Sequence, residues 1–225
     1  FHLAWALVLA KTTGKDDVVF GTVLFGRMQG GEGAQRALGL FINTLPLRVK
    51  LGAQGVAQCM KETHAALTQL LHHEHANLSL AQRCSALPGG TPLFSALLNY
   101  RYTPEGEQEQ AVPDLAWEGM EVIGGAERTN YPFGMSVDDL GKGFELVAQV
   151  HEAVDALRVC GYMHAAIKGV VDALVVRPQK PTCELQIVSE KETVQLAAWS
   201  ENTRRHEGAQ PVHRQIEAHA RLKPS

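Results

Sequence analysis

The chain has 225 residues, a formal net charge of −3, 45% hydrophobic residues and 20% charged residues. This length fits one large domain or one domain with an appendage, and the composition is that of a globular protein with a sizeable core. The small net charge predicts neither a nucleic-acid-binding surface nor an acidic tail, so we expect no nucleic-acid partner.

No apolar run reaches the ~18 residues that a membrane span needs, and no basic segment leads into an apolar stretch as in a signal peptide. We therefore expect no membrane partner. The four cysteines are scattered singly along the chain. Without a Cys-x-x-Cys pair, a zinc ribbon or a thioredoxin-type site is disfavoured, and the spacing suits reduced thiols in a cytoplasmic protein.

The first 50 residues predict a buried helix followed by two strands. The segment FHLAWALVLA is apolar nearly all round, which predicts a helix buried on several sides that ends at residues 12–14. Domains rarely begin in this way, so we interpret the chain as a piece of a longer protein. A β-branched run within residues 16–26 predicts an interior strand. After a Gly-rich loop, Leu45 begins an alternating strand in which Pro46 cannot donate a hydrogen bond, which predicts an edge strand or a bulge.

The middle of the chain predicts a helix, a strand and a hairpin. Apolar residues recur at helical spacing over residues 54–75, and residues 85–92 are rich in turn formers. Residues 93–102 are typical of a strand, and a long polar loop follows them. Two antiparallel strands are expected within residues 130–150, joined by a turn at residues 138–143.

The last third predicts two helices and a linker. Asp155 stands where an N-cap belongs, ahead of a helix expected to bury Leu157, Cys160, His164, Ile167, Val171 and Leu174. Ser189 and Glu192 have capping-box spacing before another helix. The chain then becomes polar, as in a linker with a short helix from His213. This order of elements predicts an α/β fold of the α+β two-layer type, with helices packed on a mixed sheet.

Two groups of polar residues could carry chemistry. His64, His72, His73 and His75 could be metal ligands or a catalytic base, but only Glu74 lies among them, and a helix C-terminus accounts for them better. Asp138 and Asp139 could be paired acids, but a turn explains them better. No Gly-x-Gly-x-x-Gly, Walker or Gly-x-Ser-x-Gly motif is present.

Further polar groups interrupt two apolar strands, at Asn43-Thr44 and at Asn99-Tyr100-Arg101. A buried amide without a partner costs about 1–3 kcal/mol. Either the two asparagines fasten neighbouring backbone, with Arg48 and Arg101 solvated or salt-bridged, or these residues line a channel. We favour the first interpretation and leave the second open.

Several blocks resemble the condensation domains of nonribosomal peptide synthetases. The segment LGLFINTLPLRV is similar to a core motif of that family, with Gly39, Phe41, Asn43, Thr44 and Arg48 at matching positions. The segments TPLFSALLNYR and RTNYPFGMSVDD resemble later blocks, and the C-terminal stretch resembles the linker to an adenylation domain. The HHxxxDG motif of the family is not matched, because residues 72–78 read HHEHANL.

The resemblance implies one lobe of a chloramphenicol-acetyltransferase-like pair. All matching blocks belong to the C-terminal lobe, so residues 1–186 would be that lobe and residues 187–225 a terminal helix and linker. The implied partners are the N-terminal lobe, peptidyl carrier domains and a downstream adenylation domain. The lobe would have no catalytic residue, metal or cofactor of its own, and would act on substrates tethered to phosphopantetheine. Isolated, it would expose an apolar lobe–lobe face around the first helix.

The resemblance also suggests which residues line the tunnel between the lobes. Asn43 and Thr44 are the best-supported candidates, with Asn99 and Ser136 as further ones, while Gly39, Phe41, Arg48 and Arg101 would be structural. Two alternatives stay open at this point. The chain could be a docking or scaffold module that never catalysed a reaction, or a lobe of a coenzyme-A-dependent acyltransferase of the same fold.

Overall fold

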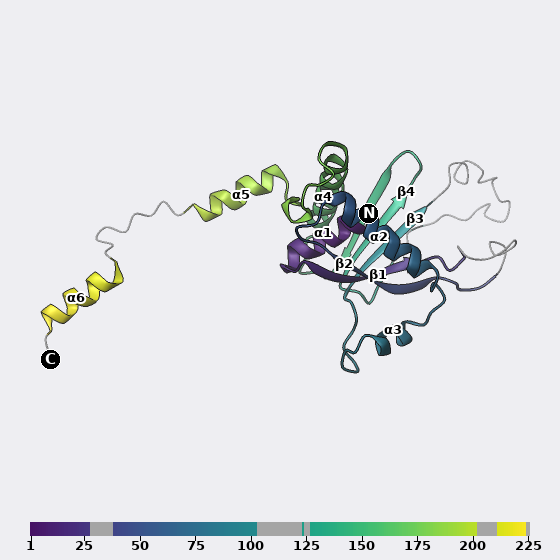
Figure 1. Ribbon diagram of the computed structural model, residues 1–225, viewed down its shortest axis with the longest axis horizontal. Helices are drawn as coiled ribbons and strands as arrows, with labels where there is room; N and C mark the ends of the chain where they lie inside the picture. Colours follow the sequence, from purple (N-terminus) through teal and green to yellow (C-terminus); the bar gives the residue numbers. More distant parts are fainter. Residues whose placement is uncertain (28–37, 103–122, 124–126, 202–210, 224–225) are drawn as a thin grey trace. The chain divides into compact units, whose positions relative to one another are not determined.

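A computed structural model describes residues 1–27, 38–102, 123, 127–201 and 211–223 (Figure 1). The described chain forms two compact units, Phe1–Ser189 and Glu190–Ser225. The predicted Gly-rich loop and the polar loop after residue 102 lie mostly outside the described residues.

The first unit is built on one mixed five-stranded sheet. Its strands are β1 (Asp17–Leu24), β2 (Asn43–Lys50), β3 (Ala96–Tyr102), β4 (Phe133–Asp139) and β5 (Phe144–Val150), in the spatial order β2-β1-β3-β4-β5. β1 pairs with β2 and β4 with β5 in antiparallel fashion, whereas β3 is parallel to both of its neighbours. β1 is therefore an interior strand and β2 an edge strand, as the sequence predicts. Pro46 has no N–H to donate, and an edge strand tolerates this because it has a neighbouring strand on one side only.

Three helices cover one face of this sheet: α1 (His2–Thr13), α2 (Val56–Leu71) and α4 (Ala156–Val176). Helix α1 contacts β1, α2 contacts β2 and α4 contacts β5. Residues of all three helices share one hydrophobic cluster with inward-facing residues of the strands. The architecture is thus the expected α/β arrangement of helices on a mixed sheet.

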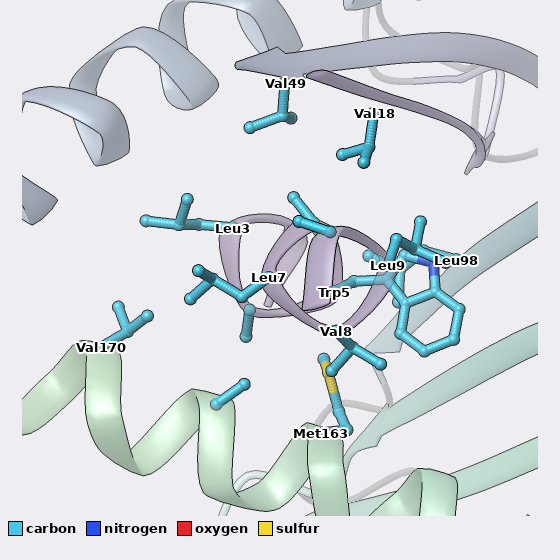
Figure 2. Packing of buried hydrophobic residues seen from close by; sticks show 14 of the residues in the cluster. Leu3, Trp5, Leu7, Val8, Leu9, Val18, Val49, Leu98, Met163 and Val170 are labelled. Atoms are coloured by element: carbon cyan, nitrogen blue, oxygen red, sulfur yellow. The ribbon is translucent and has the colours of Figure 1, made fainter. Parts of the chain in front are cut away.

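Helix α1 is the centre of the core. Every residue from Leu3 to Ala10 is buried, and Gly14 ends the helix in the left-handed conformation. Figure 2 shows α1 with Val18 and Val49 of the sheet on one side and Met163 and Val170 of α4 on the other. The expectation that an apolar face around this helix would be exposed is therefore wrong, because α2, α4 and the sheet enclose it.

His2, at the start of α1, is partly buried and shares a 2.8 Å hydrogen bond with the hydroxyl of Thr22. Burial is the main cause that lowers the pKa of His2, to about 4. The unfolded chain therefore takes up a proton near pH 6.5 that the folded chain refuses until about pH 4. Stability should rise with pH across this window and be lost as the pH falls through it.

We expect this single group to remove up to about 3 kcal/mol of stability between pH 6.5 and 4. Urea unfolding at several pH values would measure it. The variant His2→Gln keeps a hydrogen-bonding group but cannot titrate, so its stability should vary less over this range. Identical pH profiles for the two proteins would contradict the assignment.

Helix α4 begins as predicted but buries a partly different face. The carboxylate of Asp155 caps it by accepting hydrogen bonds from the backbone N–H groups of Leu157 and Arg158. Its buried residues are Val159, Met163, Ala166, Val170 and Ala173. The predicted inner face is confirmed in part, because Cys160, Ile167 and Leu174 are partly buried against the core. It is wrong at Leu157, His164 and Val171, which are exposed. When a helix is apolar on more than one face, the 3.6-residue spacing of its apolar residues does not show which face is buried.

By length and composition alone, α4 could cross a membrane, with a mean hydropathy of 1.5 over an 18-residue window. Its inner face packs against α1, and it carries a Lys168–Asp172 ion pair on its exposed side. These contacts describe a core helix of the first unit.

The remaining elements are short. Helix α2 ends at Leu71, earlier than the predicted residue 75, and is followed by α3 (Leu78–Cys84), which the sequence analysis did not predict. A 3₁₀ turn spans Thr182–Glu184. In the second unit, α5 (Glu190–Ser200) follows Ser189 as the capping-box spacing predicts, and α6 (Val212–Leu222) is the expected short helix.

Candidate functional site

Asn43 lies at the first position of β2, and its side chain fastens backbone. Its Nδ2 donates to the carbonyl oxygens of Glu74 and Ala76, both at 2.8 Å, and its Oδ1 accepts from the backbone N–H of Thr44 at 2.9 Å. Both amide hydrogens are thus engaged. Asn43 ties the start of the edge strand to the turn that follows α2, which is the favoured sequence interpretation of this residue.

Thr44 faces the side of the sheet opposite to Asn43, because side chains alternate along a strand. A Cβ atom added to Gly21 of the neighbouring strand would lie 2.9 Å from the Thr44 methyl carbon and 2.3 Å from Cε2 of Phe94. The ring of Phe94 stacks on that of Tyr131, with centroids 5.4 Å apart. The absence of a side chain at Gly21 thus makes room for an aromatic pair beside Thr44, on the face that α1 does not cover.

Asn99 and Ser136, which are 37 positions apart in the sequence, are register partners on the parallel strands β3 and β4. Their neighbours Leu98 and Met135 lie in the core, so Asn99 and Ser136 belong to the opposite face. Ser136 is 8% exposed. The sequence analysis named both residues as candidates, but only the strand register brings them together.

Arg101 continues this polar row two residues further along β3. Its guanidinium forms a bidentate pair with the carboxylate of Asp138, with 2.8 Å between Nη2 and Oδ2, and Nη1 lies 3.3 Å from Glu127. The hydrogen bonds to Asp138 raise the pKa of Arg101. Asp138 therefore belongs to strand β4 and to an ion pair, which corrects its assignment to a turn.

Asp139 does serve the turn, accepting a hydrogen bond from the backbone of Gly141 at 3.0 Å. It also accepts one from the hydroxyl of Tyr100, which belongs to the polar stretch Asn99-Tyr100-Arg101 of the sequence analysis. Burial, and then this bond to Asp139, raise the pKa of Tyr100 to about 12. The same hydrogen bond lowers the pKa of Asp139. The hydroxyl is therefore held protonated and is a donor rather than a base.

Arg48 of β2 is mostly exposed and forms a bidentate pair with Asp17 of β1, at 2.8 and 2.6 Å. The hydrogen bonds from Arg48 lower the pKa of Asp17. This ion pair links the first residue of β1 to the C-terminal part of β2. Arg48 and Arg101 are thus both salt-bridged, as the favoured sequence interpretation supposes.

Three of the four candidate histidines, His72, His73 and His75, follow the end of α2, whereas His64 lies within the helix. His72 is the C-cap of the helix, and Nε2 of His75 lies 3.7 Å from a carboxylate oxygen of the buried Glu74. In the part of the chain that the structure describes, no three His, Cys, Asp or Glu side chains are grouped so that they could hold a metal ion. The helix C-terminus interpretation is confirmed for His72, His73 and His75 and is wrong for His64.

Amides, hydroxyls and ion-paired arginines therefore make up the candidate site. Such groups bind, orient and fasten, whereas proton transfer at neutral pH needs a group whose pKa lies near the working pH. The candidates also divide between the faces: Asn43 serves the helical side, while Thr44, Asn99, Ser136 and Arg101 belong to the other.

Known proteins are similar in sequence to nearly the whole chain. The family model described as "Condensation domain" matches residues 1–197. Malpibaldin synthetase of Mortierella alpina is 46% identical over 226 aligned residues and malpinin synthetase of the same organism is 44% identical over 224, each covering 99% of this chain. A linear gramicidin synthase of Brevibacillus parabrevis is 28% identical over 98% of the chain. The chain spans only 3–4% of the length of these curated relatives.

Solved structures agree on the fold. A four-domain nonribosomal peptide synthetase bound to AMP and glycine superposes with a TM-score of 0.60 at 15% identity, over 85% of this chain and 16% of that one. The starter condensation domain of rhizomide synthetase gives a TM-score of 0.58 at 16% identity, over 82% of this chain and 41% of that chain. With the family match over most of its length, the chain belongs to the condensation domain family of nonribosomal peptide synthetases.

Proposed function

We propose that residues 1–186 are the C-terminal lobe of a peptide-bond-forming condensation domain, and that residues 187–225 are its terminal helix and the linker toward an adenylation domain. The observation that best supports this is the extent of structural similarity. Most of this chain superposes on 41% of a starter condensation domain, about the share that one of two lobes would have.

In the proposed reaction, an acceptor amine attacks the carbonyl carbon of a donor thioester. A C–N bond forms, the C–S bond breaks, and the thiol of the donor arm is released while the amine loses a proton. Both substrates would be tethered to phosphopantetheine arms on carrier domains in a cytoplasmic synthetase. Holding the two reactants together supplies much of the rate, since well-oriented intramolecular reactions reach effective concentrations of about 10⁵–10⁸ M.

This lobe would contribute the wall of the passage rather than the proton-transfer group. Thr44, Asn99 and Ser136 lie on the sheet face opposite α1, where tethered substrates would meet the second lobe. Asn43 would act indirectly, by fixing the start of β2 beside Thr44. The histidine of the HHxxxDG motif would come from the N-terminal lobe, so the isolated chain should be inactive.

The test compares two purified proteins, the isolated chain and the condensation domain that contains it together with its preceding lobe. Both receive aminoacyl groups on donor and acceptor carrier domains, and mass spectrometry detects the dipeptidyl thioester. We expect product from the whole domain and none from the isolated chain, whose folding is checked by circular dichroism. Product from the isolated chain would contradict the lobe assignment, and a whole domain without activity would favour a docking module.

A further inference from the structure

The ends of the β1–β2 connection are joined by an arginine placed between two aromatic rings. The guanidinium carbon of Arg27 lies 5.5 Å from the ring centroid of Phe25 and 5.0 Å from that of Phe41. Phe25 directly follows β1, and a single residue separates Phe41 from the start of β2. Arginine is well suited to such a position, because its planar cation stacks on aromatic faces and holds its charge at any accessible pH.

Two glycines, Gly26 and Gly39, let the backbone pass close to Phe41. Gly26 has a φ of 71°, and a Cβ atom added to it would lie 1.9 Å from the carbonyl oxygen of Phe41. Gly39 has a φ of 150°, and a Cβ atom there would lie 3.1 Å from the Phe41 ring. Both positions therefore need glycine, for conformation and for space. The backbone of Gly26 and Gly39 therefore lies close to Phe41, and the Arg27 guanidinium lies over its ring.

Four exposed apolar residues lie close to Arg27 and Phe41 in the sequence and are here named the hairpin tip: Phe25, Leu38, Leu40 and Ile42. These side chains are 59%, 98%, 100% and 63% exposed, respectively. Several exposed apolar side chains in one short stretch are typical of an interaction surface. The tip runs directly into Asn43, whose amide is fixed to the turn after α2.

We propose that Arg27 is a positioning residue for condensation, holding Phe41 against Phe25 so that the hairpin tip keeps one conformation for docking to the N-terminal lobe of the same domain. This inference rests on the proposed function. That lobe is the natural occupant, because the solved condensation domain contains a further part of comparable size and the tip continues into the candidate wall residues Asn43 and Thr44. Arg27 would touch no substrate and would act through Phe41.

The test uses the complete condensation domain and three substitutions. Arg27→Gln keeps much of the side chain's length but removes the charge, so the condensation kcat should fall roughly tenfold, the expected effect of losing a paired cation–π contact. Arg27→Lys keeps a cation near the rings but loses the planar stacking group, so its kcat should fall clearly less than that of Arg27→Gln. Arg177→Gln, at an exposed arginine after α4, is the matched control and should have no effect.

A second measurement does not depend on condensation activity. Amide hydrogen exchange of the backbone of residues 38–42 should become faster in Arg27→Gln and in Phe41→Leu, while exchange in α4 stays unchanged. Combining the two substitutions should add little to either alone, because both break the same contact. Equal losses in Arg27→Gln and Arg27→Lys would indicate simple packing and overturn the inference.

The two proposals fail in distinguishable ways. An unsubstituted domain that forms no dipeptidyl thioester would remove the proposed function and this inference with it. An active domain in which Arg27→Gln changes neither kcat nor exchange at residues 38–42 would remove the positioning role alone.

Discussion

Replacing Trp5 by alanine should destabilise the first unit by about 3–5 kcal/mol, the usual cost of removing a large buried aromatic ring. Trp5 is fully buried in α1 and stacks on Phe133 of β4, with ring centroids 5.1 Å apart and planes 15° apart. The ring therefore joins the central helix to the sheet, and its loss would leave a cavity in the middle of the core. Urea unfolding followed by circular dichroism measures the change.

The control is Trp5→Phe, which keeps an aromatic ring against Phe133 but removes the indole N–H. Among the described residues that N–H has no hydrogen-bond partner. Since an unpaired buried donor costs about 1–3 kcal/mol, its removal should offset part of the lost packing. We expect the phenylalanine variant to be clearly more stable than the alanine variant. A cost below about 1 kcal/mol for Trp5→Ala would mean that α1 is not the centre of the core.

Replacing Asn43 by aspartate should be among the most damaging polar changes in this chain. The amide donates to two carbonyl oxygens, those of Glu74 and Ala76. A carboxylate would present acceptors to acceptors and leave both carbonyls without a donor, so we expect a loss of at least about 2 kcal/mol near neutral pH. Thermal and urea unfolding of the domain provide the measurement.

A matched control exists at Asn77, the N-cap of α3. Its Oδ1 only accepts a hydrogen bond, from the backbone N–H of Ser79 at 2.9 Å, so Asn77→Asp keeps the required acceptor and should change stability little. The Asn43→Asp variant should regain stability in acid. Its new carboxyl has a raised folded-state pKa, so the folded protein binds a proton as the pH falls, and the protonated group can donate again. Equal effects of the two substitutions would show that the Asn43 amide does not hold the turn.

Condensation activity separates the two roles of the Asn43-Thr44 pair. If Asn43 acts only through the backbone, Asn43→Asp should lose activity in proportion to its loss of folded protein. A wall role for Thr44 would instead lower activity in a Thr44→Val variant that keeps its melting temperature. Activity and melting temperature together therefore test whether the two residues, on opposite faces of the sheet, have different roles.

Much of this protein followed from local pattern. The run of apolar residues in FHLAWALVLA determined a buried helix, because no face of it could be turned to water. The alternation of apolar and polar residues after Leu45, with Pro46 within it, determined an edge strand. Proline lacks the N–H that a strand with two neighbours would need to donate. Asp155 marked the start of α4, and the motif around Asn43 placed the chain in its family.

Tertiary structure decided which helix face is buried and which distant residues become neighbours, because the local sequence pattern allows more than one answer to each. α4 is apolar on more than one face, so only its packing against α1 and β5 selected Val159 and Met163 over Leu157. Asn99 and Ser136 became neighbours only through the parallel register of β3 and β4, which 36 intervening residues conceal. Likewise, nothing in the sequence around Arg27 shows that Phe25 and Phe41 would stack on it, since such contacts arise where the chain folds back on itself and not from the spacing of its residues.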